Sequence, residues 1–129
     1  MPLEPLARRY GRMDIVMIHC WPFIDEAGWL AKHVPNMYID TCWQPVLNPA
    51  FLRKSLRTWM NYVPTHKIML AHDSTSIEMA VGSSRFTREI LAETLQSHGC
   101  GADPSLRRQA AADMLHNNAV RLYGIGEAY

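Results

Sequence analysis

The chain has 129 residues, of which 48% are hydrophobic and 19% are charged, and its formal net charge is +1. This composition is typical of a globular domain and excludes a disordered chain. The near-neutral charge argues against nucleic acid as a partner, and no apolar run reaches the roughly 18 residues of a membrane span. We therefore expect a single domain over residues 1–129, with no nucleic-acid and no membrane partner.

The cysteines favour a reducing compartment. Cys20, Cys42 and Cys100 lie far apart and form no CxxC pair, and the opening MPLEPLARRYGR lacks the apolar core of a signal peptide. An odd cysteine count without an export signal favours reduced thiols in a cytoplasmic protein. Cys20 and Cys42 are interpreted as small buried hydrophobic residues.

Three apolar segments predict buried strands, at 13–18, 37–39 and 68–71. Continuous apolar runs with β-branched residues are typical of strands that are buried on both faces in a parallel sheet. About 22 and 32 residues separate the strand ends at His19, Thr41 and Asp73, a spacing that fits right-handed βαβ crossovers.

Apolar residues at helical spacing predict helices between and after these strands. Pro22 suits a first helical turn, and Asn48-Pro49 and Asp103-Pro104 are expected caps. The chain opens on a short helix that ends at Gly11, which suggests that an upstream part of a larger fold is absent. The expected helices cover 3–10, 23–34, 49–63, 86–95 (closing near Gly99), 104–115 and, after an interruption at Asn117-Asn118, 119–123.

Polar side chains follow the carboxyl end of each predicted strand. If the strands are neighbours, His19, the 41–43 segment and Asp73 share the carboxyl edge of the sheet, where α/β folds place their sites. An imidazole and a carboxylate there can bind a divalent metal or exchange protons. The alternative is that His19 is a hydrogen-bonded structural residue and that Asp73 caps a turn. Strand alternation sends His72 to the opposite face, in a structural role.

The segments HCWPFIDEAGWLAKHVPNMYIDTCW, KIMLAHDST and NNAVRLYG, in this order, resemble the amidohydrolase superfamily, in its amidohydrolase-related, decarboxylase-like branch. The resemblance covers residues 3–124. It implies an α/β fold, a partial (β/α)8 barrel made of the last three βα units with parallel strands, followed by extra carboxyl-terminal helices.

The resemblance also implies roles for two residues. In the family, the histidine that matches His19 is a metal ligand or a proton donor to the substrate. The aspartate that matches Asp73 binds the metal and handles the proton of the attacking water. His19 and Asp73 are therefore the expected catalytic and metal-binding residues, and a small molecule is the expected substrate.

The sequence departs from the family pattern. The His-x-His of the first strand is absent, and a complete barrel takes about 250 residues. Two ligands fall short of the three that a catalytic zinc takes from protein, so we expect a divalent metal, zinc first, only if other residues complete the site, and little zinc in the isolated chain. The functional hypothesis is a metal-dependent hydrolase or decarboxylase acting on a C–N or C–C bond, incomplete as a single chain. The alternative is a non-catalytic, self-associating α/β protein derived from such an enzyme.

Three strands taken from a barrel leave two edges with unpaired backbone groups and an uncovered apolar face. We therefore expect a homo-oligomer, a two-fold dimer first. The residues expected at its interface are Ile15, Met17, Ile39, Met69 and, on the opening helix, Leu3 and Leu6.

Overall fold

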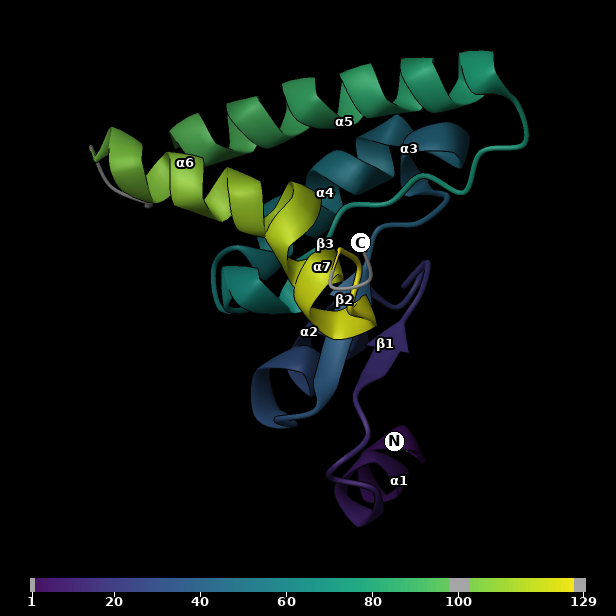
Figure 1. Ribbon diagram of the computed structural model, residues 1–129, viewed down its shortest axis with the longest axis vertical. Coiled ribbons are helices and arrows are strands. Elements are labelled where there is room, and N and C mark those ends of the chain that lie inside the picture. The colour runs from purple at the N-terminus through teal and green to yellow at the C-terminus, as the bar shows by residue number, and fades with distance from the viewer. Residues whose placement is uncertain (1, 98–102, 127–129) are drawn as a thin grey trace.

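The computed structural model describes residues 2–97 and 103–126. Three short strands, β1 (Ile15–Met17), β2 (Met37–Asp40) and β3 (Ile68–Met69), form a parallel sheet in the order β1-β2-β3 (Figure 1). The register pairs Ile15 with Met37 and Ile39 with Ile68. The predicted fold class, α/β with three parallel strands, is confirmed.

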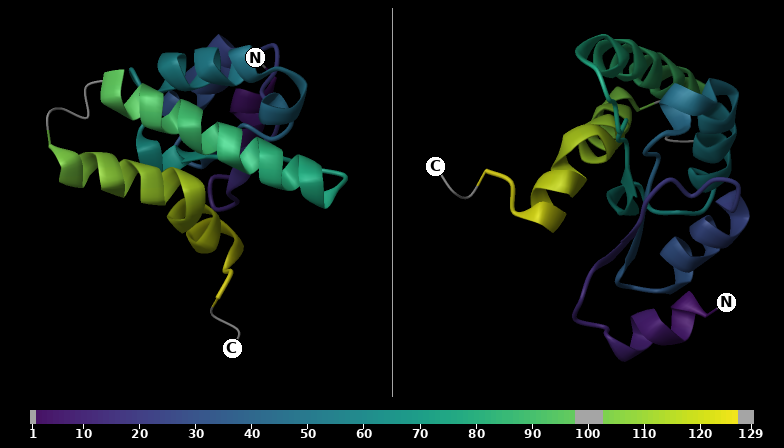
Figure 2. Two further views of the ribbon diagram at one scale, coloured as in Figure 1. Left: turned by 90° about the horizontal axis from the view of Figure 1, so that it is seen from above. Right: turned by 90° about the vertical axis from the view of Figure 1, so that its right-hand side faces the viewer.

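Helices surround this sheet. The long helix α5 lies across α3 and α4 in Figure 1, with α1 at the other end of the molecule, and Figure 2 shows α6 running beside α5. None of the described helices is long and apolar enough to cross a membrane. The helices are α1 (Leu3–Arg9), α2 (Ile24–His33), α3 (Gln44–Leu47), α4 (Pro49–Trp59), α5 (Ile77–Ser97), α6 (Pro104–Ala112) and α7 (Asn118–Tyr123), with a 3-10 turn η1 (Thr65–Lys67) and a π-helical segment η2 (Asp113–Asn117).

Helices α2 and α4 pack closely against each other and form the main core with the sheet. The side chain of Asn48 accepts a hydrogen bond from Phe51 N–H and begins α4, as predicted. Trp59 is fully buried, and its Nε1–H donates to the carbonyl of Ile24 at 2.8 Å. A Cβ atom at Gly28 would overlap the Trp59 side chain, so only glycine permits this close approach of the two helices.

Two buried polar side chains attach neighbouring elements. The amide of Asn36 donates to the carbonyls of Ala7 and Met13 at 3.0 and 2.8 Å, which holds α1 against the turn before β2. The ammonium of Lys67 donates to the carbonyl of Ala31 at 2.9 Å, in the last turn of α2. A cation at that end also complements the helix dipole.

The outer edge of β3 is covered by the chain itself. The Leu70 N–H donates to the Met114 carbonyl at 3.0 Å, within η2. The Asn118 amide donates to the carbonyls of Ile68 and Thr65, both at 2.8 Å. The expectation of an unpaired edge is therefore wrong at β3, because the carboxyl-terminal helices supply its hydrogen-bond partners.

The outer edge of β1 is different. Within the described residues β1 pairs only with β2, and its three residues are half-buried. Ile39 and Met69, expected at an interface, are instead 0% and 3% exposed, because the chain's own helices bury them. Exposed apolar side chains lie on and around the first strand and helix: Leu3, Leu6, Met13 and Ile18.

Three further expectations about helices need correction. Helix α5 begins at Ile77 rather than near residue 86, and its expected end near Gly99 lies outside the described residues. Asn117-Asn118 does not interrupt the last helix, because the chain passes from η2 directly into α7. Helix α2 begins at Ile24, after a cis Trp21–Pro22 peptide bond, so Pro22 precedes the first helical turn.

Candidate functional site

The segments that follow the three strands bring three potential ligands together. One atom each of the His19 imidazole, the Cys42 thiol and the Asp73 carboxylate lie within 4.8 Å of one another. His19 follows β1, Cys42 follows β2 and Asp73 follows β3. His19 and Cys42 are half-buried and Asp73 is exposed, so the cluster is open to a ligand on one side. The structure thus places the two predicted site residues side by side, and Cys42, from the predicted 41–43 segment, lies near them as expected.

Left-handed backbone is concentrated at the same strand ends. His19, Cys20, Trp43 and Asp73 have φ angles of 66°, 55°, 67° and 53°. For a residue with a Cβ atom this conformation costs about 1–2 kcal/mol. Such strain is typical of functional sites, where surrounding structure holds a residue in place.

The His19 ring is oriented by a hydrogen bond. Its Nδ1 lies 3.2 Å from the carbonyl oxygen of Cys42, and a carbonyl only accepts, so Nδ1 carries the proton in this contact. The other ring nitrogen, Nε2, then keeps its lone pair for a cation or a proton. The Gln44 side chain donates to the His19 carbonyl at 2.6 Å and fixes the backbone of the same residue.

Asp40, at the end of β2, supports Cys42 and was not among the predicted site residues. Its Oδ1 accepts the Cys42 N–H at 2.5 Å. Burial removes water from the Asp40 carboxylate and raises its pKa from 3.8 to about 6. The sequence signal was its position directly after the predicted strand at 37–39, but only the fold shows what the side chain contacts.

The two described cysteines have different surroundings. Cys20 is 8% exposed and its thiol donates to the Met17 carbonyl at 3.1 Å, which agrees with a structural role. Cys42 is half-buried, which differs from the prediction of a core residue. Burial, and then the charges of Asp40 and Asp73, raise the pKa of the Cys42 thiol to about 12, so without a cation it is not a nucleophile near neutral pH.

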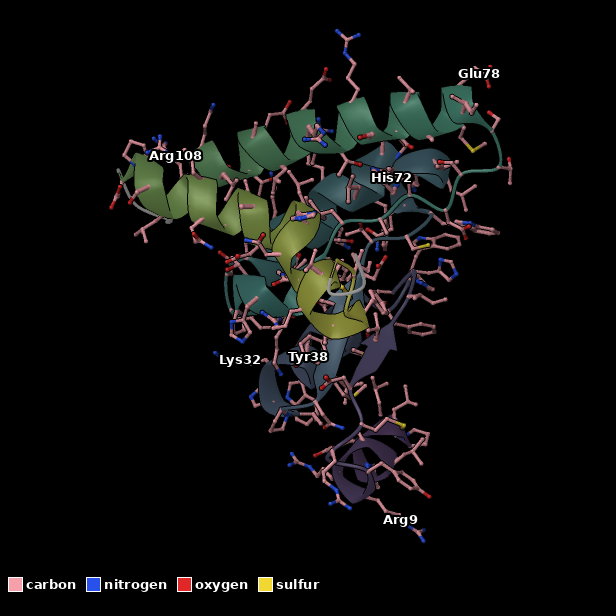
Figure 3. All side chains as sticks on the ribbon, viewed as in Figure 1. Arg9, Lys32, Tyr38, His72, Glu78 and Arg108 are labelled. Atoms are coloured by element: carbon pink, nitrogen blue, oxygen red, sulfur yellow. The ribbon has the colours of Figure 1, made fainter. Side chains whose placement is uncertain are left out.

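His72 does not join the cluster of the three side chains. Figure 3 shows it below α5, on the segment that joins β3 to that helix. Its Nε2 is buried and has no hydrogen-bond partner among the described residues. Burial, and then the nearby charge of Arg88, lower the pKa of His72. Its carbonyl accepts the Trp43 N–H at 3.3 Å and so links the segments that carry Cys42 and Asp73.

A cavity of about 140 Å³ opens beside the cluster. A closed cavity of similar size, near 150 Å³, binds benzene, so this one accommodates a single ring-sized apolar group. Its walls are mostly apolar, and the ring of Trp43 lies 5.2 Å from that of His19. The cavity is lined by His19, Cys42, Trp21, Trp43, Leu47 and Phe51, with Gln44 and Asn48.

A family model described as amidohydrolase matches residues 1–125. The chain belongs to the amidohydrolase family. It is 29% identical over 130 residues to Protein fluG of Emericella nidulans, an alignment that covers 97% of this chain and 15% of that protein. A crystal structure from Lactobacillus casei, assigned as a metal-dependent hydrolase, matches it with a TM-score of 0.77 and 25% identity, over 94% of this chain and 34% of that one. This amidohydrolase chain therefore spans about a third or less of the length of these relatives.

The family and the structural neighbour point to a divalent metal, and the residues of the cluster fit one. His19 offers an imidazole nitrogen whose partner nitrogen is already hydrogen-bonded, the usual arrangement of a ligating histidine. Asp73 offers exposed carboxylate oxygens beside it. Nitrogen and oxygen donors of these types bind first-row divalent metals.

Proposed function

We propose that this chain carries the carboxyl-terminal part of the active site of a metal-dependent hydrolase or decarboxylase, in the decarboxylase-like branch of the amidohydrolase family. The site would act on a C–N or C–C bond of a small molecule, with zinc as the first candidate metal. The convergence of His19 and Asp73 within 4.8 Å, from two different strand ends, supports this proposal most directly.

The rest of the site is proposed to come from an upstream segment or another chain. The chain has no His-x-His, and it spans only 34% of its structural neighbour. In a barrel, the ligands of the earlier strands would face the same carboxyl edge. The three βα units described here are proposed to be the last three of such a barrel.

The residues of this chain have separate tasks in the proposed reaction. A bound divalent cation supplies Lewis acidity, which polarises a carbonyl group and lowers the pKa of water. Asp73, exposed beside the cluster, accepts a proton from the attacking water. His19 would either hold the cation through Nε2 or, in its doubly protonated form, donate a proton from Nε2 to the substrate. The apolar cavity beside His19 excludes water from one side and orients an apolar substituent.

A non-catalytic, self-associating protein is the second candidate. The unpaired outer edge of β1 and the exposed Ile18, Leu3 and Leu6 favour it. The same features support a homodimer in either case, with Ile15 and Met17 at its interface. A cytoplasmic location is proposed because Cys20 and Cys42 are free thiols.

Zinc titration of the whole chain, with His19→Ala and Asp73→Asn as variants, tests the proposal. We expect each change to weaken binding by at least about 10-fold, and His72→Ala, which alters a histidine outside the cluster, to leave it unchanged. When the upstream segment or partner chain that completes the site is present, release of CO2 or amine from a panel of apolar carboxylic acids and amides should stop in EDTA and return with Zn²⁺. Zinc affinity that is equal in all four proteins would contradict the metal site. A dimer that binds no metal and releases no product would support the second candidate.

A further inference from the structure

We propose that Cys42 is a third protein ligand of this site, bound as a thiolate, and that the site therefore selects thiophilic divalent cations such as Zn²⁺ and Co²⁺ over Mg²⁺ and Mn²⁺. This inference rests on the proposed function and deepens it, because it names a ligand and a class of metal that the family resemblance does not supply.

The position of the thiol is the first argument. The sulfur of Cys42 lies in the same group of ligand atoms, within 4.8 Å, as the donors of His19 and Asp73. At tetrahedral angles, zinc bonds of about 2.0 to 2.3 Å place two ligand atoms roughly 3.3 to 3.8 Å apart, so side-chain movements of about 1 Å close the set. Nitrogen, sulfur and oxygen then supply the three protein ligands of an open zinc site.

The support of Cys42 is the second argument. Its N–H donates to Asp40 Oδ1, and its carbonyl accepts from His19 Nδ1 at 3.2 Å. One residue therefore orients the imidazole with its backbone and presents a sulfur to the same space. The left-handed residue Trp43 comes immediately afterwards and turns the chain into α3.

Cys20 provides a contrast within the same region. It follows His19 directly, yet its side chain is buried in the main hydrophobic core and its thiol donates to the Met17 carbonyl. Cys20 thus shows the surroundings of a structural cysteine in this fold: a hydrophobic core and a backbone carbonyl as acceptor. Cys42 is instead half-buried, lines the cavity and faces Asp73.

Binding through sulfur has a defined proton balance. The S–H bond of Cys42 breaks, its sulfur bonds to the cation, and the proton passes to the buffer. Thiolate is a soft ligand that suits zinc and cobalt, whereas magnesium and manganese prefer oxygen. With only two ligands, the sequence predicted little zinc in the isolated chain. A third ligand would let the chain hold zinc more tightly than His19 and Asp73 alone allow.

Titration with Co²⁺ under reducing conditions tests the inference, because sulfur bound to cobalt gives a near-ultraviolet charge-transfer absorption. We expect this absorption in the unmodified protein, in Cys20→Ser and in Cys100→Ser, although Cys100 lies outside the described residues. Cys42→Ser should lose it and bind Zn²⁺ at least about 10-fold more weakly. Zinc should displace the cobalt, and millimolar Mg²⁺ should not.

A second measurement needs no variant and so does not depend on how Cys42→Ser folds. X-ray absorption by Zn²⁺ bound to the unmodified chain should show a sulfur neighbour at about 2.3 Å. Cobalt binding without the absorption, or an absorption that persists in folded Cys42→Ser, would overturn the thiolate ligand and leave the metal site of His19 and Asp73 standing. The absence of both cobalt and zinc binding would overturn the two proposals together.

Discussion

The outer edges of β1 and β3 differ in whether other parts of the chain bind their free backbone groups. Beyond β3, the Met114 carbonyl and the Asn118 amide of the chain's own carboxyl-terminal helices take up the free backbone groups. Beyond β1, no strand pairs within the described residues, and Ile18 just past its end is 57% exposed. The described part of the chain therefore completes its own sheet at the β3 edge and leaves the β1 edge without a neighbouring strand.

The candidate site lies between these unequal sides. Asp73 follows β3, whose outer edge is covered, and His19 follows β1, whose outer edge is exposed. A change at the β3 edge should therefore act on the stability of the folded chain, whereas a change at the β1 edge should act on association. Four experiments test this distinction between the two edges.

The largest effect is expected from Asn118→Leu, at the covered edge. Asn118 is fully buried, and its amide satisfies two carbonyl groups. Each buried carbonyl left without a donor costs about 1–3 kcal/mol, so the free energy of unfolding, measured in urea, should fall by about 4 kcal/mol. Asn117→Leu is the control, since its exposed amide donates to the neighbouring Asp113 side chain and not to β3, and it should change stability by less than about 0.5 kcal/mol. Equal losses in both variants would contradict the covering of β3 by Asn118.

A dependence of stability on pH is expected from Asp40, at the end of the central strand β2. Its pKa is about 6 in the folded chain against 3.8 ordinarily, so between these values the unfolded chain releases its proton first. The contribution of Asp40 to stability is then fully present below pH 4 and is lost as the pH rises through 6, by about 3 kcal/mol. Unfolding in urea with EDTA, compared for the unmodified protein and Asp40→Asn, should show this slope only in the former. Parallel curves would mean that Asp40 does not titrate in this range.

A change in association is expected from Ile18→Asp, at the bare edge. If two copies meet through β1, a carboxylate buried there without a partner should weaken dimerisation by at least about 100-fold. Light scattering across concentrations measures this, and the stability of the monomer should change little. Leu106→Asp is the matched control, because Leu106 is 56% exposed on α6, away from β1. If the unmodified chain is monomeric at micromolar concentration, the proposed dimer is contradicted.

The smallest effect is expected from the left-handed residue after β1. Cys20→Gly and Cys20→Ala both remove the buried thiol, but only glycine adopts a φ of 55° without strain. The glycine variant should therefore be about 1 kcal/mol more stable than the alanine variant in thermal or urea unfolding. Ala92, at an exposed position of α5, is the control. There the glycine variant, Ala92→Gly, should be less stable than the unmodified protein with alanine. An alanine variant at least as stable as the glycine one would show that position 20 is not strained.

The sequence was sufficient for the strands and for the meeting of His19 with Asp73. The apolar runs predicted all three strands, although β1 is half-buried rather than buried on both faces. Parallel strands then necessarily share their carboxyl edge. The start of α5 was missed because Ile77 and Val81, in its first turns, are 80% and 65% exposed and give no buried stripe.

Tertiary contacts explain the other differences. Asn118 was interpreted as a local interruption, since asparagine disfavours helix interiors. Its amide instead reaches β3, which lies 50 residues away along the chain. The environment of Cys42 likewise depends on Asp40 and Asp73, whose positions follow from the packed sheet rather than from neighbouring residues.

The π-helical segment η2 determines the rotation of the last helix. A π turn holds more residues than an α turn, so the segment shifts the angular phase of every residue that follows it. Removing one residue from Asp113–Asn117 would permit a regular α-helix but would rotate α7 by about 100°. The Asn118 amide would then point away from β3. The length of this segment is therefore more tightly constrained than the identity of its exposed residues, and a single deletion there should cost more stability than most substitutions.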